Sequence, residues 1–577
     1  MFSLKSLKAA YLLILLSVYF DFGQAQTHGG RANWWYFGIA VTPGTGVNNG
    51  ILMNFNNLNP GPATSTVVVP GSISVPYSIS DKNGNLLFYG NGDSVFTATG
   101  QTMPNGVFGN GTFPSNGFSF PSGVVIPQPC HPERYYVFYP EMNSNGFNML
   151  YSVVDMTLNN GAGDVDTNYK NVKINQWGDA FSVVTATRHA NNRDYWVVLR
   201  SLSGNDWYAY LLTPNGLSTV PVVSSIGLST FFSVFQTQGQ FKFSPSGNKL
   251  AFANNRRFPN NPCAYINNAQ PSCVDSFAIE LFDFDRSTGQ LNNDIQIYQD
   301  TANFYHFSIH GSQQLPTWRR GYFVSLEFSL NENLLYLSTG GLNNNRTPFV
   351  QYEISSGNAQ IITGSYYSVS GIFVTSLQLG PDGKLYFTGR NPPSSRIDLM
   401  RINNPNIFGS LSNPNPTILN GTILNPIGGI INYGFPSPLS DQLIVRTAAS
   451  QPTAICAQDT FNLTLNDTNF VDSVLWQLPN EPPKWAHSPG FGVPHAFAQE
   501  GLYPVTGVVY SGCEFDTIFD TLRVHPQPNA HLGPDTLLCE GDTFAMNFQD
   551  TTFSYLWNTG DTTPGIEIFL PDTYSVT

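Results

Sequence analysis

The sequence predicts an all-β protein: a six- or seven-bladed β-propeller followed by β-sandwich domains, the last of which is incomplete. Three observations lead to this prediction. The 577 residues include 52 Gly and 41 Pro, with 14% aromatic and only 11% charged residues, which is typical of many short strands joined by turns. A strand–turn–strand unit recurs along residues 26–445. After about Pro452 the composition changes, and sandwich-like patterns begin.

The clearest copy of this unit is the segment Phe241–Ala253, FKFSPSGNKLAFA. Phe241 and Phe243 alternate with polar residues, as a half-buried strand requires. Ser-Pro-Ser-Gly at 244–247 is a turn sequence, because Pro fixes φ and Gly accepts a positive φ. Alternation resumes after the turn, so the segment predicts a hairpin.

Similar segments recur about every 50 residues, with one longer interval, which is close to the period of a propeller blade. One such sheet cannot bury both of its faces, whereas a ring of sheets can. Six blades are visible, and strands near Trp34, Ile51 and Ile430 offer a seventh assembled from both ends of the propeller, so six and seven blades both remain open. The other five copies begin at Tyr77, Val124, Thr185, Leu326 and Leu377.

The N-terminus predicts a signal peptide over residues 1–25. Lys5 and Lys8 precede an apolar run from Ala9 to Phe20, and small residues lie before Gln26. The apolar run is too short for a comfortable membrane span. We therefore expect a protein that is secreted or held at the cell surface and does not span the membrane after the signal is removed.

Six cysteines in an exported chain predict disulfides. Two cysteines bracket a Pro/Asn-rich loop, and two others fall within one C-terminal domain. The sequence indicates no partner for Cys130 or for Cys539. The predicted pairs are Cys263 with Cys273 and Cys456 with Cys513.

The C-terminal region predicts one sandwich over residues 446–526 and a partial second one over residues 527–577. In the first, Cys513 follows the GLYPVT strand that contains Tyr503. In the second, the equivalent Tyr574 lies just before Thr577, so a partner for Cys539 would lie beyond this sequence. We expect the chain to be a fragment of a longer protein, with the continuation and the mode of anchoring undetermined.

Several segments resemble the propeller of large secreted bacterial surface proteins of the gliding-motility-associated, type IX secretion kind. They include SDKNGNLLFY, RHANNRDYWVV, KFSPSGNKLAFA and QLGPDGKLYF, within a stretch from Trp34 to Ser440. VLWQLPNE and PHAFAQEGLYPVT resemble strands of a PKD or Ig-like module, although residues 477–479 lack the usual Asp. The resemblance implies a surface or adhesion role, with a defined reaction in few members and a C-terminal sorting domain after the modules.

Catalytic patterns are weak in this sequence. No G-x-S-x-G is present, and Glu133, Asp179, Asp194 and Glu327 stand singly, whereas glycoside hydrolysis requires two facing carboxylates. We therefore predict a non-catalytic binding or adhesion protein and not an enzyme. Two alternatives stay open: a polysaccharide-active lyase or glycosidase with accessory sandwiches, and a purely structural matrix or motility component.

No cofactor is predicted. The Asp81–Asn85 segment resembles a calcium loop but lacks the distal Glu, so a turn is favoured over structural calcium. Asp194, Asp283 and Asp285 are interpreted as turn residues in the same way. His189 is expected to make a structural hydrogen bond.

Two long loops, 254–275 and 301–321, are predicted to rise over one face of the propeller, while the turns of the repeat lie on the other face. Guanidinium groups bind anions, and aromatic rings stack on sugars. We expect a binding face for an acidic glycan or an acidic protein surface; ordinary loops whose Arg residues pair with local Asp are the alternative. The net charge of −13 disfavours nucleic acid. The candidate residues are Arg256, Arg257, Tyr305, His306, Trp318, Arg319 and Arg320.

Overall fold

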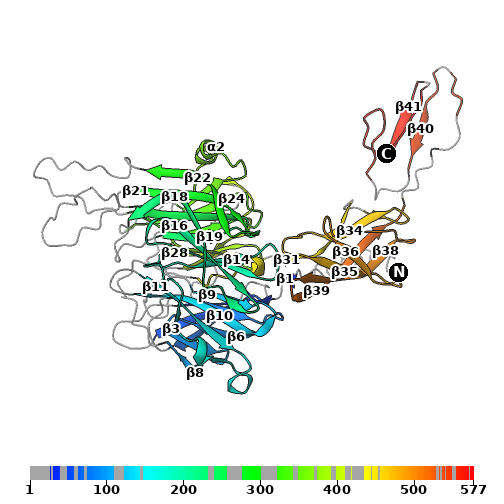
Figure 1. Ribbon diagram of the computed structural model, residues 1–577. Helices are drawn as coiled ribbons and strands as arrows, with labels where there is room; N and C mark the ends of the chain where they lie inside the picture. Colours follow the sequence, from blue (N-terminus) through cyan, green and yellow to red (C-terminus); the bar gives the residue numbers. More distant parts are fainter. Residues whose placement is uncertain are drawn as a thin grey trace, which may run out of the picture.

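The computed structural model describes most of the chain from Gln26 to Val576 (Figure 1). Residues 1–25, the predicted signal peptide, lie outside the described residues. The described ranges are 26–27, 30–38, 48–56, 63–69, 75–108, 123–142, 147–231, 239–256, 276–300, 321–341, 349–369, 373–390, 398–409, 417–418, 435–443, 445–451, 455–527, 532, 536–539, 541–548, 554–570 and 572–576.

The protein is all-β, and seven antiparallel sheets follow one another over the described part of residues 34–418. The first four sheets consist of β2 (Trp34–Gly38), β3 (Asn48–Asn54) and β4 (Ala63–Val69); β5 (Tyr77–Ser80), β6 (Leu86–Gly90), β7 (Ser94–Thr97) and β8 (Thr102–Val107); β9 (Val124–Gln128), β10 (His131–Met142), β11 (Phe147–Asp155), β12 (Asp164–Val165) and β13 (Val172–Lys173); and β14 (Thr185–Arg188), β15 (Tyr195–Arg200), β16 (Ser203–Thr213), β17 (Gly216–Leu217) and β18 (Val222–Phe231).

The last three of the seven sheets have four strands each. They are β19 (Gly239–Phe243), β20 (Lys249–Arg256), β21 (Ser276–Asp285) and β22 (Gln290–Asp300); β23 (Gly321–Phe328), β24 (Leu334–Gly341), β25 (Phe349–Glu353) and β26 (Tyr367–Val369); and β27 (Phe373–Leu379), β28 (Leu385–Arg390), β29 (Asp398–Ile402) and β30 (Thr417–Ile418). The helical elements described in full are α2 (Ala359–Gly364) and short 3-10 turns at Asn159–Gly161, Thr167–Tyr169 and Ser440–Leu443 (η5). None of the described helices has the length and apolar character that crossing a bilayer needs.

The predicted hairpins are confirmed: each of the six repeated segments forms an antiparallel pair. In the segment that best displays the repeat, Phe241 faces Phe252 and Phe243 faces Leu250. Gly247 has φ +74°, and a Cβ there would lie 1.9 Å from the Thr187 hydroxyl oxygen, so this turn position requires glycine.

Each sheet packs against the next through a shared apolar core, and the last sheet also packs against the first. At this last contact the Trp35 ring of β2 lies edge-on to the Tyr386 ring of β28, with centroids 5.6 Å apart. Phe435, which follows the last sheet in sequence, packs on Trp35 at 5.4 Å. The first and last parts of this seven-sheet unit are therefore joined by buried aromatic contacts.

A second unit follows, in which two sheets share one core. Trp476 is fully buried at the centre of this core, between residues of both sheets. One sheet contains β32 (Ala448–Gln451), β34 (Phe461–Leu465) and β37 (Val493–His495); the other contains β33 (Ile455–Cys456), β39 (Glu514–His525), β38 (Gly501–Ser511), β35 (Ser473–Gln477) and β36 (Lys484–His487). We call this unit the sandwich.

A hairpin of β40 (Phe544–Asn547) and β41 (Gly565–Ile568) lies beyond the sandwich (Figure 1). Its small core surrounds the buried Trp557. Near the other end of the chain, β1 (Gln26–Thr27) pairs with β31 (Val445–Arg446), which leads from the seven-sheet unit into the sandwich.

Candidate functional site

The junction between the seven-sheet unit and the sandwich is built from the turns of the repeat. Hairpin turns of the second, third and fourth sheets, at 81–85, 129–130 and 189–194, meet the tight turn 511–514 between β38 and β39. Gly512 has φ +59°, and a Cβ there would come within 2.6 Å of the Arg193 Cα. The close fit of these turns makes the junction a specific contact.

A disulfide joins the two units across this junction, between Cys130 and Cys513, with Cα atoms 5.2 Å apart. The predicted Cys456–Cys513 pair is therefore wrong, and Cys456 and Cys539 are free thiols. Cys456 lies in β33, at the opposite end of β39 from Cys513, because Cys456 pairs with His525 and Cys513 precedes Glu514. The predicted partners Cys263 and Cys273 lie outside the described residues.

Arg188, at the end of β14, forms the buried centre of the junction. Its guanidinium contacts Asp441 of η5 and, at 3.2 Å, Glu514 of the sandwich; the Arg188 and Asp441 side chains are each 1% exposed. Burial by itself would lower the pKa of Arg188. The interactions with Tyr195, Asp441 and Glu514 are stronger than this effect, so the pKa of Arg188 is raised. Arg188 also donates to Ser511 Oγ at 3.2 Å.

Glu514 also forms an ion pair with a second arginine, which lies near the N-terminal end of the chain. Arg31 binds both carboxylate oxygens of Glu514, at 2.9 and 2.7 Å, in the bidentate geometry that makes the strongest such pairs. Burial alone would raise the pKa of Glu514, yet the charges and hydrogen bonds of Arg31, with Arg188, hold that pKa well below its usual range. Glu514 therefore stays ionised at neutral pH and ties both arginines to the sandwich.

Polar contacts extend the junction outward. Asp472 of the sandwich accepts from Asn192 Nδ2 at 2.8 Å and from Gly512 N at 2.6 Å. Lys82 donates to the Phe515 carbonyl at 3.2 Å, and its ammonium lies 5.5 Å from the centre of the Phe515 ring. A cavity of about 10 Å³ lies beside the disulfide and has room for a single water.

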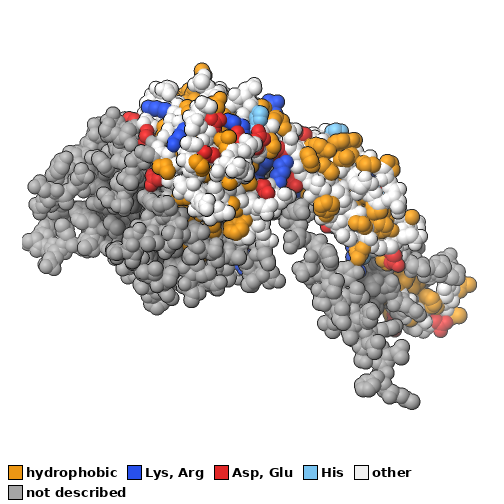
Figure 2. Space-filling view, turned by 90° about the horizontal axis from the view of Figure 1, so that it is seen from below, with side chains coloured by type: hydrophobic (Ala, Val, Ile, Leu, Met, Phe, Trp, Pro, Cys, Tyr) orange, Lys and Arg blue, Asp and Glu red, His pale blue; other side chains and the backbone are white. Residues whose placement is uncertain are grey.

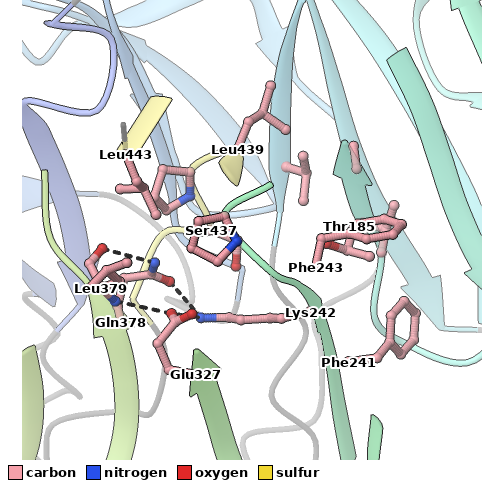
Figure 3. Close-up of a pocket in the computed structure, with 15 residues that line it drawn as sticks. Thr185, Phe241, Lys242, Phe243, Glu327, Gln378, Leu379, Ser437, Leu439 and Leu443 are labelled. Atoms are coloured by element: carbon pink, nitrogen blue, oxygen red, sulfur yellow. Dashed lines mark hydrogen bonds and ion pairs between the residues drawn. The ribbon is translucent and has the colours of Figure 1, made fainter. Parts of the chain in front are cut away.

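A second candidate site is a cavity inside the seven-sheet unit (Figure 3). First strands of the third to seventh sheets line it, together with the segment 437–443 that leads toward the sandwich. Lys242 donates to Glu327 Oε2 and Gln378 Oε1, both at 2.7 Å, and to the Leu377 carbonyl at 3.3 Å. Lys242 was expected on the polar side of a half-buried strand, but it is buried, because that side faces the cavity.

The volume of this cavity is about 30 Å³, enough for about two water molecules. Glu327 is the one acidic side chain among its described lining residues, and the ion pair with Lys242 occupies it. Two facing carboxylates, as glycoside hydrolysis requires, are not present around this described cavity. The arrangement binds the innermost strands to one another and leaves little room for a ligand.

Asp194 lies in a turn and Asp285 ends β21 where a turn begins, whereas Asp283, also interpreted as a turn residue, lies within β21 and pairs with Lys249 at 3.0 Å. Asp194 accepts hydrogen bonds from Asn191 Nδ2 and from Nε and Nη2 of Arg193, at 2.8–2.9 Å. Asp285 accepts from Ser287 and Thr288, and these hydrogen bonds lower its pKa to about 2. His189 makes the expected structural hydrogen bond, since its Nδ1 accepts from Asn191 N at 2.9 Å.

Asp81 likewise closes its turn by accepting from the Asn83 and Asn85 amides, each at 2.8 Å. Within the described ranges, no group of three or more His, Cys, Asp or Glu is placed to hold a metal ion. The side chains of the predicted ligand-binding residues lie outside the described residues: those of Arg256, Arg257, Tyr305, His306, Trp318, Arg319 and Arg320.

Sequence reasoning missed the junction. One signal was available: Cys130 occupies the turn of a repeat copy, in PQPCHPE, and Cys513 occupies a Ser-Gly-Cys-Glu turn. Two cysteines in exposed turns of different units can meet only if those turns face each other. The charges of Arg31, Arg188 and Glu514 carry no such signal, because each has ordinary neighbours in sequence.

Comparisons with known proteins identify no family. No family model matches the chain, and no curated protein matches it. Among solved structures, a Lactobacillus plantarum protein aligns with TM-score 0.39 and 12% identity over 70% of this chain and 99% of its own. Kuenenia stuttgartiensis hydrazine synthase aligns with TM-score 0.35 and 13% identity over 66% of this chain and 99% of its own. Chaetomium thermophilum Sqt1 bound to the N-terminus of ribosomal protein L10 aligns with TM-score 0.33 and 11% identity over 65% of this chain and 82% of its own.

Proposed function

We propose that this chain is an exported, non-catalytic binding or adhesion protein of the cell surface or extracellular matrix, in which a seven-bladed β-propeller is held in a fixed orientation on β-sandwich spacers. The observation that carries the proposal is the Cys130–Cys513 disulfide across the junction. A disulfide persists in an oxidising compartment, which supports export. The buried pairs of Glu514 with Arg31 and Arg188 oppose rotation of one unit against the other.

Three features support the propeller. The seven sheets follow one another in sequence, the last packs on the first, and first strands of five of them line one narrow cavity. A ring of sheets removes open edges and lets every sheet bury both faces.

PKD/Ig-like spacers are supported by a feature common to the sandwich and the hairpin beyond it. Tyr503 donates its hydroxyl to the Gln499 carbonyl at 2.9 Å, and Tyr574 donates to the Leu570 carbonyl at 3.1 Å. A tyrosine bonded to backbone a few residues upstream is typical of Ig-like sandwiches. With the quoted motifs, this favours the surface proteins of the gliding-motility and type IX secretion kind as the class of this chain.

A test follows from the export and the junction. Cells that express the tagged chain are fractionated with thiols blocked at lysis, and the Cys130–Cys513 peptide is measured by mass spectrometry. We expect the chain outside the cytoplasm with this disulfide formed, and weaker attachment to surfaces in cells that lack the chain. Free Cys130 and Cys513 thiols in a cytoplasmic chain would refute export, and unchanged attachment would refute adhesion.

A further inference from the structure

The outer face of the larger sheet of the sandwich is apolar and carries exposed aromatic rings. Side chains alternate along β35, β36, β38 and β39, and one set enters the core while the other points outward. Figure 2 shows hydrophobic side chains gathered on the surface of the sandwich. The outward set is Ser473, Leu475, Gln477, Trp485, His487, Leu502, Pro504, Thr506, Val508, Tyr510, Phe515, Thr517, Phe519, Thr521, Arg523 and His525.

Four of these rings form a continuous row across the strands. Trp485 stacks on His487, with centroids 5.9 Å apart and planes 9° from parallel, and lies 5.2 Å from Tyr510. Tyr510 lies 6.1 Å from Phe515, where the row ends, and Phe519 lies farther along β39 on the same face, beyond Thr517. From β36 to β39 the row crosses three strand spacings, about 14 Å.

These rings are well exposed for their size. Trp485 is 52% exposed, Phe515 58% and Phe519 67%. A contiguous apolar patch of this kind on a protein surface marks an interaction site, whereas single exposed apolar residues are ordinary. The flat, ordered sheet holds the rings in place, so a partner binds without ordering them first.

The charge of the patch indicates which partner fits. Among the outward-facing residues Arg523 is the only one with a permanent charge, in a chain of net charge −13. A second copy brings the same net charge of −13, and a polyanion would be repelled by the whole molecule. Uncharged rings beside Ser, Thr and Gln side chains suit a neutral polysaccharide, because sugar C–H groups pack on the negative face of an aromatic ring while sugar hydroxyls hydrogen-bond with polar side chains.

We propose that this aromatic face binds a neutral polysaccharide built of hexopyranose rings. The row ends at Phe515, which contacts Lys82 across the junction, so the patch is continuous with the established contact between the two units. A chain of several sugars lying along the row would reach the seven-sheet unit. This site deepens the proposed binding role and rests on it only for access to an extracellular polymer.

The test is native affinity electrophoresis of the full chain in gels that contain hydroxyethyl cellulose, glucomannan or amylopectin, with alginate as the anionic comparison. We expect retardation in at least one neutral gel and none in alginate. Trp485→Ala and Phe519→Ala should each weaken the apparent affinity about tenfold. Tyr366→Ala is the control, since Tyr366 is 50% exposed on the seven-sheet unit, and it should leave retardation unchanged.

Thr517→Glu keeps every ring and places a carboxylate between Phe515 and Phe519. Because this charge lies within the uncharged face, the variant should show no retardation in the neutral gels. Thermal unfolding of each variant establishes that it is folded. Normal migration of the wild type in all three neutral gels would overturn the proposal, as would equal retardation of the ring variants. Sedimentation of the wild type as a dimer that Trp485→Ala dissociates would assign the face to a second copy instead. Export is tested separately, by cell fractionation and by detection of the disulfide. Failure of this proposal can therefore be distinguished from failure of the proposed export.

Discussion

The carboxylate of Glu514 in the sandwich pairs with two arginines at once: Arg31 Nη2 lies 2.7 Å from Oε1, and Arg188 Nη2 lies 3.2 Å from Oε2. Arg31 lies near the described N-terminal end, and Arg188 lies in the fourth sheet. One side chain in a turn thus joins three distant parts of the chain. Figure 2 shows acidic and basic side chains lying together near this junction.

Glu514→Ala should destabilise the protein by about 3 kcal/mol, because it leaves buried Arg31 without its carboxylate and removes one of the two carboxylates that Arg188 contacts. Chemical unfolding monitored by fluorescence measures this. The control is Glu500→Ala, since Glu500 is exposed in the same sandwich and its loss should change the free energy of unfolding by less than about 0.5 kcal/mol. Equal effects of the two substitutions would show that the ion pairs add nothing to stability.

The contribution of Glu514 should depend on pH in one direction. Its pKa in the folded protein is held well below the ordinary value, so its stabilisation is complete above the unfolded pKa of about 4.3 and is lost as pH falls toward the folded pKa. The difference in melting temperature between wild type and Glu514→Gln should be constant from pH 7 to 5 and shrink below about pH 4. A difference that stays constant down to pH 3 would contradict this assignment.

The disulfide prediction distinguishes the cysteines. Cys130→Ser and Cys513→Ser should each lower the free energy of unfolding by about 2–4 kcal/mol, since either removes the same cross-link. Cys456→Ser is the matched control and should have little effect, because Cys456 is a free thiol. A peptide that links Cys456 to Cys513 in non-reducing mass spectrometry would refute the pairing.

The buried Lys242–Glu327 pair should be structural. Lys242→Met should cost about 3–5 kcal/mol because it leaves Glu327 buried without its cation, whereas the double variant Lys242→Met/Glu327→Leu should cost less than either single change. Urea unfolding of the four proteins in the cycle measures the coupling. Additive costs would mean that the two side chains do not interact.

Much of the fold could be predicted because the repeat is local. The alternation of Phe241 and Phe243, the Ser-Pro-Ser-Gly turn and the residues that follow determine a hairpin within one short segment. The same reasoning located the other hairpins and the turn roles of Asp81, Asp194 and Asp285. Interactions between residues close in sequence leave patterns that can be read directly.

The junction could not be predicted in the same way. Cys130 and Cys513 are separated by 383 residues, and Cys456 was the nearer partner by sequence and by domain. The alternation of Phe241 and Phe243 with polar residues places Lys242 on the polar side of a strand, whereas the neighbouring sheets enclose it. Burial of a charge depends on which surfaces meet, and a single strand does not contain that information.

The sequence by itself determined the strands, the turns and the division into a repeated unit and a later sandwich, because these depend on side-chain alternation and turn chemistry over a few residues. Only the tertiary structure decided which turns face the sandwich, which cysteines pair and which rings of the sandwich stay exposed. These depend on contacts between segments hundreds of residues apart, where shape and charge complementarity between folded surfaces, and not local preference, select the partner.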